Sequence, residues 1–294
     1  MHGVLVIDKP PGLTSHDVVA AARRAFGEPR IGHTGTLDPM ATGVLPLACG
    51  AATRLARFLA GADKDYDAEI RVGLETDTYD VTGREVARSD RRPSAEEIVA
   101  ALRTLTGGYL QAPPPFSAKK IGGRRAYELA RAGVVRQPAP TPVCVTRLEL
   151  VGVRGDVVSM RLTSSAGFYV RSLAHELGKR LETGACLQAL RRTRSGEFTL
   201  SHAVAMEALA GPAAVAGSRL LPMERLLPGL PAVTVTPEGL SWVSHGRAIA
   251  QAQATGPLPE HAPWVRLMGQ DGALVALAEP GGTPGSLHPS VVLI

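Results

Sequence analysis

The sequence predicts a mixed α/β protein with an at least partly antiparallel sheet, followed by a small β-barrel. Apolar residues make up 45% and charged residues 20% of the 294 residues, which is typical of a folded protein and excludes disorder, collagen-like sequence and coiled coil as descriptions of the whole chain. Helical and strand patterns are intermixed along most of the chain. Short strands punctuated by Gly and Pro follow residue 229, so we expect about two domains.

Local patterns define the elements of the first part in order. Short apolar runs bounded by turn residues indicate strands, and a Ser before an apolar helical pattern indicates a helix start. These patterns predict a strand at 4–7, a helix capped by Ser15, a helix at 51–60, a strand at 66–72, and a helix opened by a capping box of Ser94 and Glu97.

Two runs rich in Val, Leu and Thr, residues 142–153 and 156–165, predict a β-hairpin around Arg154-Gly155. The alternation of apolar and polar residues continues from Met160 to Arg171, so we expect one extended segment on which Tyr169 and Arg171 share a face. A bulge at Gly167 would break this register.

A domain boundary is expected near Leu230, where Pro and Gly interrupt the helical pattern and the charge balance changes sign. The whole chain has 32 basic and 27 acidic residues, a net charge of +5, whereas residues 229–294 hold two basic and four acidic residues. The positive charge therefore belongs to residues 1–228, which permits an anionic partner. Four short apolar runs after Leu230 predict the small barrel, at 232–235, 264–268, 273–278 and 290–293.

Composition argues against several other classes. The three cysteines show no paired CxxC spacing, so we expect neither a disulfide framework nor a thiolate zinc site. The eight histidines show no close ligand pairing, and we expect no metal. The apolar amino-terminal run is too short for a signal peptide, and no run reaches eighteen apolar residues. We therefore expect a cytoplasmic protein without membrane contact.

The densest candidate for chemistry is the Gly-rich segment 32–47. Asp38 directly before Pro39 favours a helix start, because its carboxylate can accept from free backbone N–H groups. The same carboxylate, rigidly placed beside glycines, would also suit nucleophilic attack or proton transfer. A phosphate-binding loop is disfavoured, because Val44-Leu45 follows Gly43 where that motif requires Lys and Ser or Thr.

Two further features could serve a site or simply face solvent. A guanidinium at Arg171 would keep a neighbouring carboxylate ionised, and Tyr169 could stack on a planar base; the alternative is an ordinary strand end. Residues 113–142 hold six basic residues and one acidic residue between proline-rich boundaries. This insertion, called the basic arm below, would suit a phosphate backbone or would be a solvated loop. Arg191, Arg192 and Arg194 form a second basic cluster.

The segment Gly32-His33-Thr34-Gly35-Thr36-Leu37-Asp38-Pro39-Met40-Ala41-Thr42-Gly43 closely resembles the TruB family of tRNA pseudouridine-55 synthases. Further matching blocks span most of residues 3–200 in the family's order: 3–12, Lys64-Asp65-Tyr66, 167–171 and 187–192. The basic arm is similar to the one with which stand-alone bacterial members grip the T-loop. The resemblance implies a pseudouridine synthase fold with a central, largely antiparallel sheet over residues 1–228, and a PUA-like domain over 229–294.

The resemblance also implies the reaction, isomerisation of one uridine in the T arm of tRNA. Asp38 would act on the ribose, either as nucleophile at C1′ or as the base that removes the 2′ hydrogen, and Arg171 would hold its charge. The uridine would be flipped out and stacked on Tyr66, counted here among the catalytic residues. Tyr169 would lie across the pocket, and His33 would help to occupy the space left by flipping.

The resemblance further places Leu190 in the uracil pocket and the RNA backbone against Lys119, Lys120, Arg124 and Arg125. It implies no cofactor, tRNA as the partner, no obligatory protein partner and a monomer. This chain has Phe168 where relatives often carry a small polar residue. A second hypothesis is a non-catalytic RNA-folding module built from the basic arm and the small domain.

Overall fold

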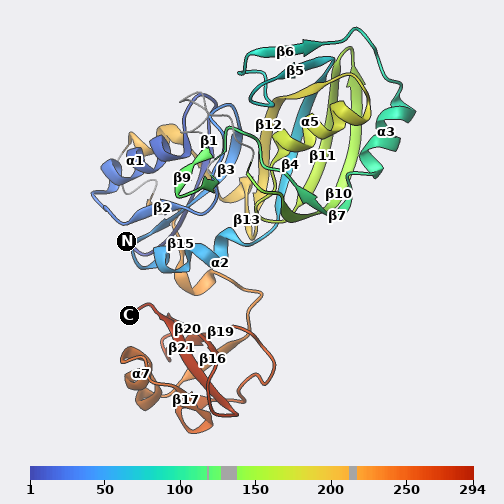
Figure 1. The fold of residues 1–294 in the computed structure, drawn as a ribbon. Coiled ribbons are helices and arrows are strands. Elements are labelled where there is room, and N and C mark those ends of the chain that lie inside the picture. Colours follow the sequence, from blue (N-terminus) through green and yellow to red (C-terminus); the bar gives the residue numbers. More distant parts are fainter. Residues whose placement is uncertain (118, 127–137, 212–216) are drawn as a thin grey trace.

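The computed structural model describes residues 1–117, 119–126, 138–211 and 217–294, and these residues form two main sheets (Figure 1). The larger sheet has the order β14-β1-β3-β12-β4-β11-β10-β7, with β2, β13 and β15 pairing beside it. Its strands are β1 (Gly3–Lys9), β2 (Ile31–His33), β3 (Thr42–Cys49), β4 (Lys64–Val72), β7 (Gly107–Gln111), β10 (Thr141–Arg154), β11 (Val157–Ser164), β12 (Ala185–Ser195), β13 (Phe198–Thr199), β14 (Ala203–Ala205) and β15 (Leu221–Pro222).

Most neighbours in this sheet are antiparallel, as predicted, and two pairs are parallel, β1 with β14 and β3 with β12. The β3 and β12 ladder is short and joins two halves of the sheet through Arg191 opposite Thr42 and Arg192 opposite Gly43. Gly43 has a φ of 100°, and a Cβ there would collide with the Arg192 carbonyl oxygen. Glycine therefore lets the two halves of the sheet meet directly after the Asp38 loop.

Helices cover one face of the large sheet. They are α1 (Ser15–Phe26), α3 (Ala95–Arg103) and α5 (Val170–Arg180), and their buried stripes join the larger apolar core. Alternate residues of β1 point to opposite sides: Leu5 and Ile7 enter this core, whereas Val4 and Val6 enter a second core. The second core is closed by η1 (Gly50–Leu55), α2 (Ala56–Ala60) and the C-terminal unit.

Several predicted elements are confirmed with shifted ends. The strand predicted at 4–7 is β1, the strand predicted at 66–72 is β4, and the hairpin is formed by β10 and β11. The Ser94–Glu97 capping box is present at α3. The helix predicted at 51–60 is divided into η1 and α2, and the cap of α1 is Thr14 rather than Ser15, because Thr14 pairs with Asp17 in a capping box.

Two predictions around the site are wrong. No helix starts at Asp38: Pro39 and Met40 form a turn, the Ala41 N–H donates to the Asp38 carbonyl at 3.0 Å, and β3 begins at Thr42. The continuous apolar run after Thr42 favours a buried strand. The extended segment does not reach Arg171 either. It ends with β11, and α5 begins at Val170 after a turn at Gly167, which adopts a φ of 81°.

The C-terminal unit is a six-stranded sheet of order β17-β21-β20-β19-β16-β18. Its elements are β16 (Ala232–Val235), α7 (Pro237–Ser244), β17 (Ile249–Ala250), η5 (Gln251–Gln253), β18 (Ala254–Thr255), β19 (Val265–Met268), β20 (Leu274–Pro280) and β21 (Ser286–Val292). The two edge strands, β17 and β18, are joined by η5 alone, so the sheet curls back on itself and is nearly a barrel, as predicted.

The small unit packs on α2 (Figure 1). The rings of Phe58 and Trp264 meet edge to face at 4.7 Å, and the Arg57 guanidinium lies over both rings. Arg54 donates to the Val292 carbonyl at 2.5 Å.

The remaining short elements are the β5 (Leu74–Thr76) and β6 (Glu85–Arg88) hairpin, the β8 (Lys120–Ile121) and β9 (Arg124–Arg125) hairpin, η2 (Leu200–His202), η3 (Met206–Leu209) and η4 (Met223–Arg225). Within the described residues, no helix combines the length and apolar character needed to cross a bilayer.

Candidate active site

The centre of the site is an ion pair between Asp38 and Arg171. The Nε and Nη2 atoms of Arg171 donate to the two carboxylate oxygens of Asp38 at 2.8 and 2.9 Å. The Arg171 side chain is 7% exposed and the Asp38 side chain 32% exposed. The guanidinium is therefore fixed in the protein, while its carboxylate partner stays open to a ligand.

Arg171 is held by three further acceptors. Nη1 donates to the Thr78 carbonyl at 3.0 Å and lies 3.6 Å from the Asp80 carboxylate, and Nη2 also donates to the Phe116 carbonyl at 3.0 Å. A buried guanidinium thus lies between two carboxylates, of which Asp38 is accessible and Asp80 is buried.

Asp80 was missed by the sequence reasoning. One of its carboxylate oxygens accepts from Thr78 Oγ1 at 2.9 Å and from the backbone N–H and Oγ1 of Thr82 at 3.0 and 2.5 Å. The pattern Thr-x-Asp-x-Thr is a signal for a locally hydrogen-bonded turn, and could have marked this carboxylate. Its proximity to Arg171 could not be deduced from spacing, because 91 positions of chain separate them.

Lys9 and Ser15 anchor the backbone around Asp38. The fully buried Lys9 Nζ donates to the Leu13 carbonyl at 2.7 Å and the Pro39 carbonyl at 3.1 Å. Burial lowers the pKa of Lys9 to about 8, and the nearby Asp38 carboxylate opposes that shift. Ser15 Oγ donates to the Leu37 carbonyl at 3.0 Å and accepts from its N–H at 2.8 Å. The residues before and after Asp38 are therefore both fixed.

Arg192 holds the backbone of the Gly-rich segment that contains Asp38. Its side chain is almost completely buried and donates to the carbonyls of Val44, Thr36 and Gly35 at 2.7, 3.3 and 3.0 Å. Burial lowers its pKa, and a hydrogen bond with the Tyr66 hydroxyl opposes that shift. Arg192 is thus a structural anchor.

The second basic cluster predicted from sequence is not a free positive surface. Arg191 pairs with Asp8 at 3.1 and 2.8 Å, and Arg194 pairs with Asp65 at 2.7 and 2.8 Å. With Arg192 buried, all three positive charges are used within the protein.

Two tyrosines lie near the Asp38 carboxylate. Tyr66 on β4 is 8% exposed and belongs to the larger core, and burial raises its pKa. Tyr169 is half-buried at the start of α5, where its backbone N–H and carbonyl are both bonded to the Gln111 side chain at 2.8 and 3.1 Å. Burial also raises the pKa of Tyr169, and the Asp38 charge acts in the same direction on both hydroxyls.

His33 lies at the end of β2. Its ring meets the ring of His16 edge to face at 6.3 Å, and its buried Nδ1 atom has no hydrogen-bond partner. Burial, together with the charges of His16 and Arg192, lowers the pKa of His33. The imidazole is therefore neutral around pH 7 and has an unsatisfied polar atom.

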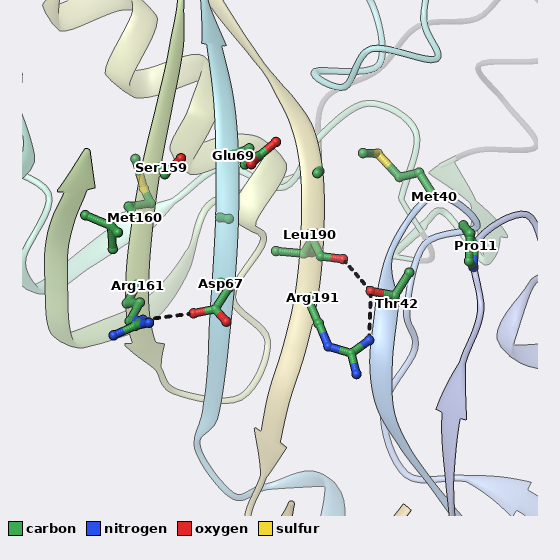
Figure 2. A pocket seen from close by; sticks show the side chains of 13 residues that line it. Pro11, Met40, Thr42, Asp67, Glu69, Ser159, Met160, Arg161, Leu190 and Arg191 are labelled. Atoms are coloured by element: carbon green, nitrogen blue, oxygen red, sulfur yellow. Dashed lines mark hydrogen bonds and ion pairs between the residues drawn. The ribbon is translucent and has the colours of Figure 1, made fainter. Parts of the chain in front are cut away.

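A cavity of about 450 Å³ lies between the two halves of the large sheet (Figure 2). Met40 and Thr42 come from one half, Asp67 and Met160 come from the other, and Leu190 lies on β12 between them. The Thr42 hydroxyl donates to the Leu190 carbonyl at 3.4 Å. Of the residues predicted for the site, Leu190 lines this cavity, whereas Asp38 and Arg171 do not.

The basic arm is described only in part. Lys120 lies on β8 and Arg124 on β9, and the two strands form a hairpin around Gly122-Gly123. Lys119 and Arg125 lie at the two ends of this hairpin, and Lys119 is half-buried. Residues 127–137 of the predicted arm lie outside the described residues. In the described parts of the chain, no three His, Cys, Asp or Glu side chains are grouped as metal ligands would be.

Comparison with known proteins adds a family to this geometry. The model of the TruB family pseudouridylate synthase N-terminal domain matches residues 23–170, and that of the tRNA pseudouridylate synthase B C-terminal domain matches residues 171–228. A tRNA pseudouridine synthase B of Symbiobacterium thermophilum is 48% identical over 84% of this chain and 83% of its own length. That of Solibacter usitatus is 41% identical over the full length of both.

Solved structures are similar over the whole chain. A chain in a structure of an H/ACA RNP bound to a substrate RNA containing 2′-deoxyuridine has a TM-score of 0.74 and 25% identity, covering 100% of this chain and 85% of that chain. A Cbf5-Nop10-Gar1 complex contains another, with a TM-score of 0.74, 27% identity and the same coverage.

Proposed function

The chain belongs to the TruB family of pseudouridylate synthases, and from this premise we propose that it isomerises uridine to pseudouridine at position 55 in the T-loop of tRNA. The observation that carries the proposal is the exposed Asp38 carboxylate held by the buried Arg171 guanidinium. The pair supplies an ionised, oriented and accessible carboxylate oxygen, which is what an attack or proton abstraction at a ribose requires.

The reaction rearranges one nucleotide without adding or removing atoms. The bond between C1′ and N1 breaks, the uracil turns, a bond between C1′ and C5 forms, and the proton lost from C5 is balanced by one gained at N1. Asp38 acts either as nucleophile at C1′ or as the base that removes the 2′ hydrogen. Arg171 keeps Asp38 ionised in both versions.

The target uridine has to leave the folded T-loop to reach Asp38. In the proposed complex it stacks on Tyr66, Tyr169 lies across the pocket and assists proton transfer at the base, and Leu190 lines the uracil side. The nearness of Tyr66 to Asp38 and the place of Leu190 in the cavity support these roles. His33 occupies the space left in the tRNA.

The partner in this proposal is tRNA, and the relatives' name, tRNA pseudouridine synthase B, supports it. The basic arm binds the RNA backbone through Lys119, Lys120, Arg124 and Arg125. Two of the similar solved structures are complexes of Cbf5 with Nop10, and one of these two also contains Gar1. For this chain we propose action as a monomer in the cytoplasm, without an obligatory protein partner or cofactor.

Purified protein and an unmodified tRNA transcript, with no other protein and no cofactor, test this proposal. Pseudouridine mapped by base-specific chemical labelling to the T-loop position is the expected result. Product at another position would contradict the assigned site, and product that requires an added protein would contradict independent action.

A further inference from the structure

The loop between β5 and β6 holds an aromatic residue in a strained backbone conformation beside the active site. Tyr79 has a φ of 64°, and it is one of three described non-glycine residues with positive φ. A bulky side chain rarely adopts this conformation, which persists only where the surroundings hold it. Tyr79 stands between Thr78 and Asp80, the two residues of this loop that face Arg171.

The backbone of Tyr79 is tied to β12. Its carbonyl accepts from the Leu187 N–H at 2.9 Å, and the Val81 N–H donates to the Leu187 carbonyl at 2.9 Å. The strained φ turns the chain between these bonds. As a result, the Thr78 carbonyl before the turn and the Asp80 carboxylate after it both face Nη1 of Arg171, at 3.0 and 3.6 Å.

The side chain of Tyr79 is tied to α5. Its ring stacks on the imidazole of His175, with the ring centroids 3.8 Å apart and the planes at 8°. His175 is 8% exposed and lies four residues after Arg171, so both side chains leave the same side of the helix. One helix therefore carries both the guanidinium and the ring that holds the loop in front of it.

Burial keeps the ring of His175 neutral. Nδ1 lies 3.4 Å from a carboxylate oxygen of Glu75 on β5, and Glu176 and Lys179 flank it on α5. Burial lowers the pKa of His175, the charge of Lys179 adds to this effect, and the two glutamates oppose it. A neutral imidazole stacked on a neutral phenol needs no counterion, so the contact acts as packing between two flat rings.

We propose that Tyr79 and His175 are positioning residues for the isomerisation: their stack fixes the β5–β6 loop against α5 and thereby orients Arg171 toward Asp38. The inference rests on the proposed function. Neither ring touches Asp38, so the effect on catalysis is transmitted through Thr78, Asp80 and Arg171. A small misplacement of such a clamp lowers the rate of chemistry more than substrate binding.

The test uses leucine substitutions that keep side-chain bulk and remove the flat ring, Tyr79→Leu and His175→Leu. Leu227 of this chain has a φ of 56°, so leucine is compatible with the backbone at position 79. Tyr79→Phe keeps the ring. Glu182→Ala is the matched control, because Glu182 has a φ of 54° and lies just beyond the far end of α5.

Each leucine variant should lower kcat about tenfold or more, with KM for tRNA within about threefold of wild type. The double leucine variant should have the same kcat as the less active of the two single variants, because the two rings act as a unit. Tyr79→Phe and Glu182→Ala should both keep the wild-type kcat. Melting midpoints are measured in parallel.

Wild-type kcat in both leucine variants would overturn the inference, as would equal losses in Tyr79→Phe and Tyr79→Leu. A loss of kcat that follows the melting midpoint in every variant, including Glu182→Ala, would show general destabilisation and overturn it too. If Tyr79→Leu does not fold, His175→Leu alone decides: wild-type kcat in that variant would overturn the inference. Wild-type protein that yields no pseudouridine would instead contradict the proposed function.

Discussion

At the scale of single residues, the site depends on one guanidinium with many acceptors. Arg171 donates to Asp38, Thr78 and Phe116, and it faces the buried Asp80. A lysine carries a compact ammonium group in place of the planar guanidinium, so it cannot donate to acceptors on two sides at once. This difference separates the effect of charge from the effect of geometry.

Arg171→Lys should therefore lower kcat about 100-fold with KM for tRNA little changed, because the Asp38 carboxylate loses its two-point orientation. The free energy of unfolding should fall by about 2 kcal/mol, since buried acceptors lose partners. Steady-state kinetics and urea unfolding measure both effects. Arg88→Lys, in an exposed pair with Glu85, is the control and should change neither. Wild-type kcat in Arg171→Lys would contradict the role of the guanidinium.

His33 provides a prediction about pH. Its folded-state pKa is lowered by burial, His16 and Arg192, below the ordinary value of 6.5. The unfolded chain therefore binds a proton that the folded chain resists, and stability is lost as pH falls through and below 6.5.

Urea unfolding at pH 7.5 and 5.5 should show a smaller loss of unfolding free energy in His33→Asn than in wild type. His261→Asn, which alters an exposed side chain, should show the wild-type loss. An equal loss in wild type and His33→Asn would contradict a lowered pKa of the half-buried His33.

The sequence was informative about residues to different degrees. The motif around Asp38 and the block ending at Arg171 were recognisable, but the contact between them spans 133 positions and depends on the β3 and β12 junction. Asp80 and the Tyr79–His175 stack were not predicted. The Thr-x-Asp-x-Thr pattern around Asp80 marks only a local turn, and both features become significant only when the β5–β6 loop packs against α5.

At the scale of elements, the errors came from local signals that the tertiary structure overrides. Asp38-Pro39 has the residue types of a helix start, yet the apolar run after Thr42 forms strand β3 of the large sheet. The alternation of apolar and polar residues from Met160 to Arg171 suggested one strand, but the structure changes from strand to helix within it. Gly167 turns the chain, and Leu173, Ala174 and Leu177 then form a buried helical stripe. The β10–β11 hairpin was correctly predicted because strand composition and turn residues agree there.

The basic arm carries the prediction at this scale. Replacing Lys119, Lys120, Arg124 and Arg125 with Ala should weaken tRNA binding. The slope of log K against log salt concentration should become shallower by about 0.9 for each lost duplex phosphate contact. Binding isotherms at several salt concentrations measure the slope. Arg84→Ala/Arg88→Ala, which removes two exposed charges at the β5–β6 hairpin, should leave the slope unchanged. An unchanged slope in the arm variant would remove the arm from the RNA interface.

At the scale of the whole molecule, the acidic C-terminal unit is joined to the basic larger unit through an apolar contact. Trp264 meets Phe58, and residues of β20 share a core with Val4 and Val6 of β1. The change of sign in charge predicts a separate unit from about Leu230 onward, and the docking surface of this unit was not predicted. Phe58 and Trp264 are 206 positions apart, and no periodic pattern links them.

Trp264→Ala should lower the free energy of unfolding by about 2 kcal/mol and separate one unfolding transition into two, because it removes the aromatic contact between the units. Calorimetry resolves the transitions. Trp242→Ala, which removes the other tryptophan from the core of the small unit, should lower the midpoint without the same separation. A single, unshifted transition in Trp264→Ala would contradict energetic coupling through this contact.

The measurement that tests the central claim most directly compares wild type with Asp38→Asn on one unmodified tRNA transcript, with product position and tRNA affinity recorded together. Asparagine keeps the shape of Asp38 and removes its charge. We predict pseudouridine at the T-loop position with wild type, and about 10³-fold or more loss of turnover with unchanged affinity in the variant. Retained turnover in Asp38→Asn would contradict the account, and tight binding without product in wild type would favour an RNA-folding module.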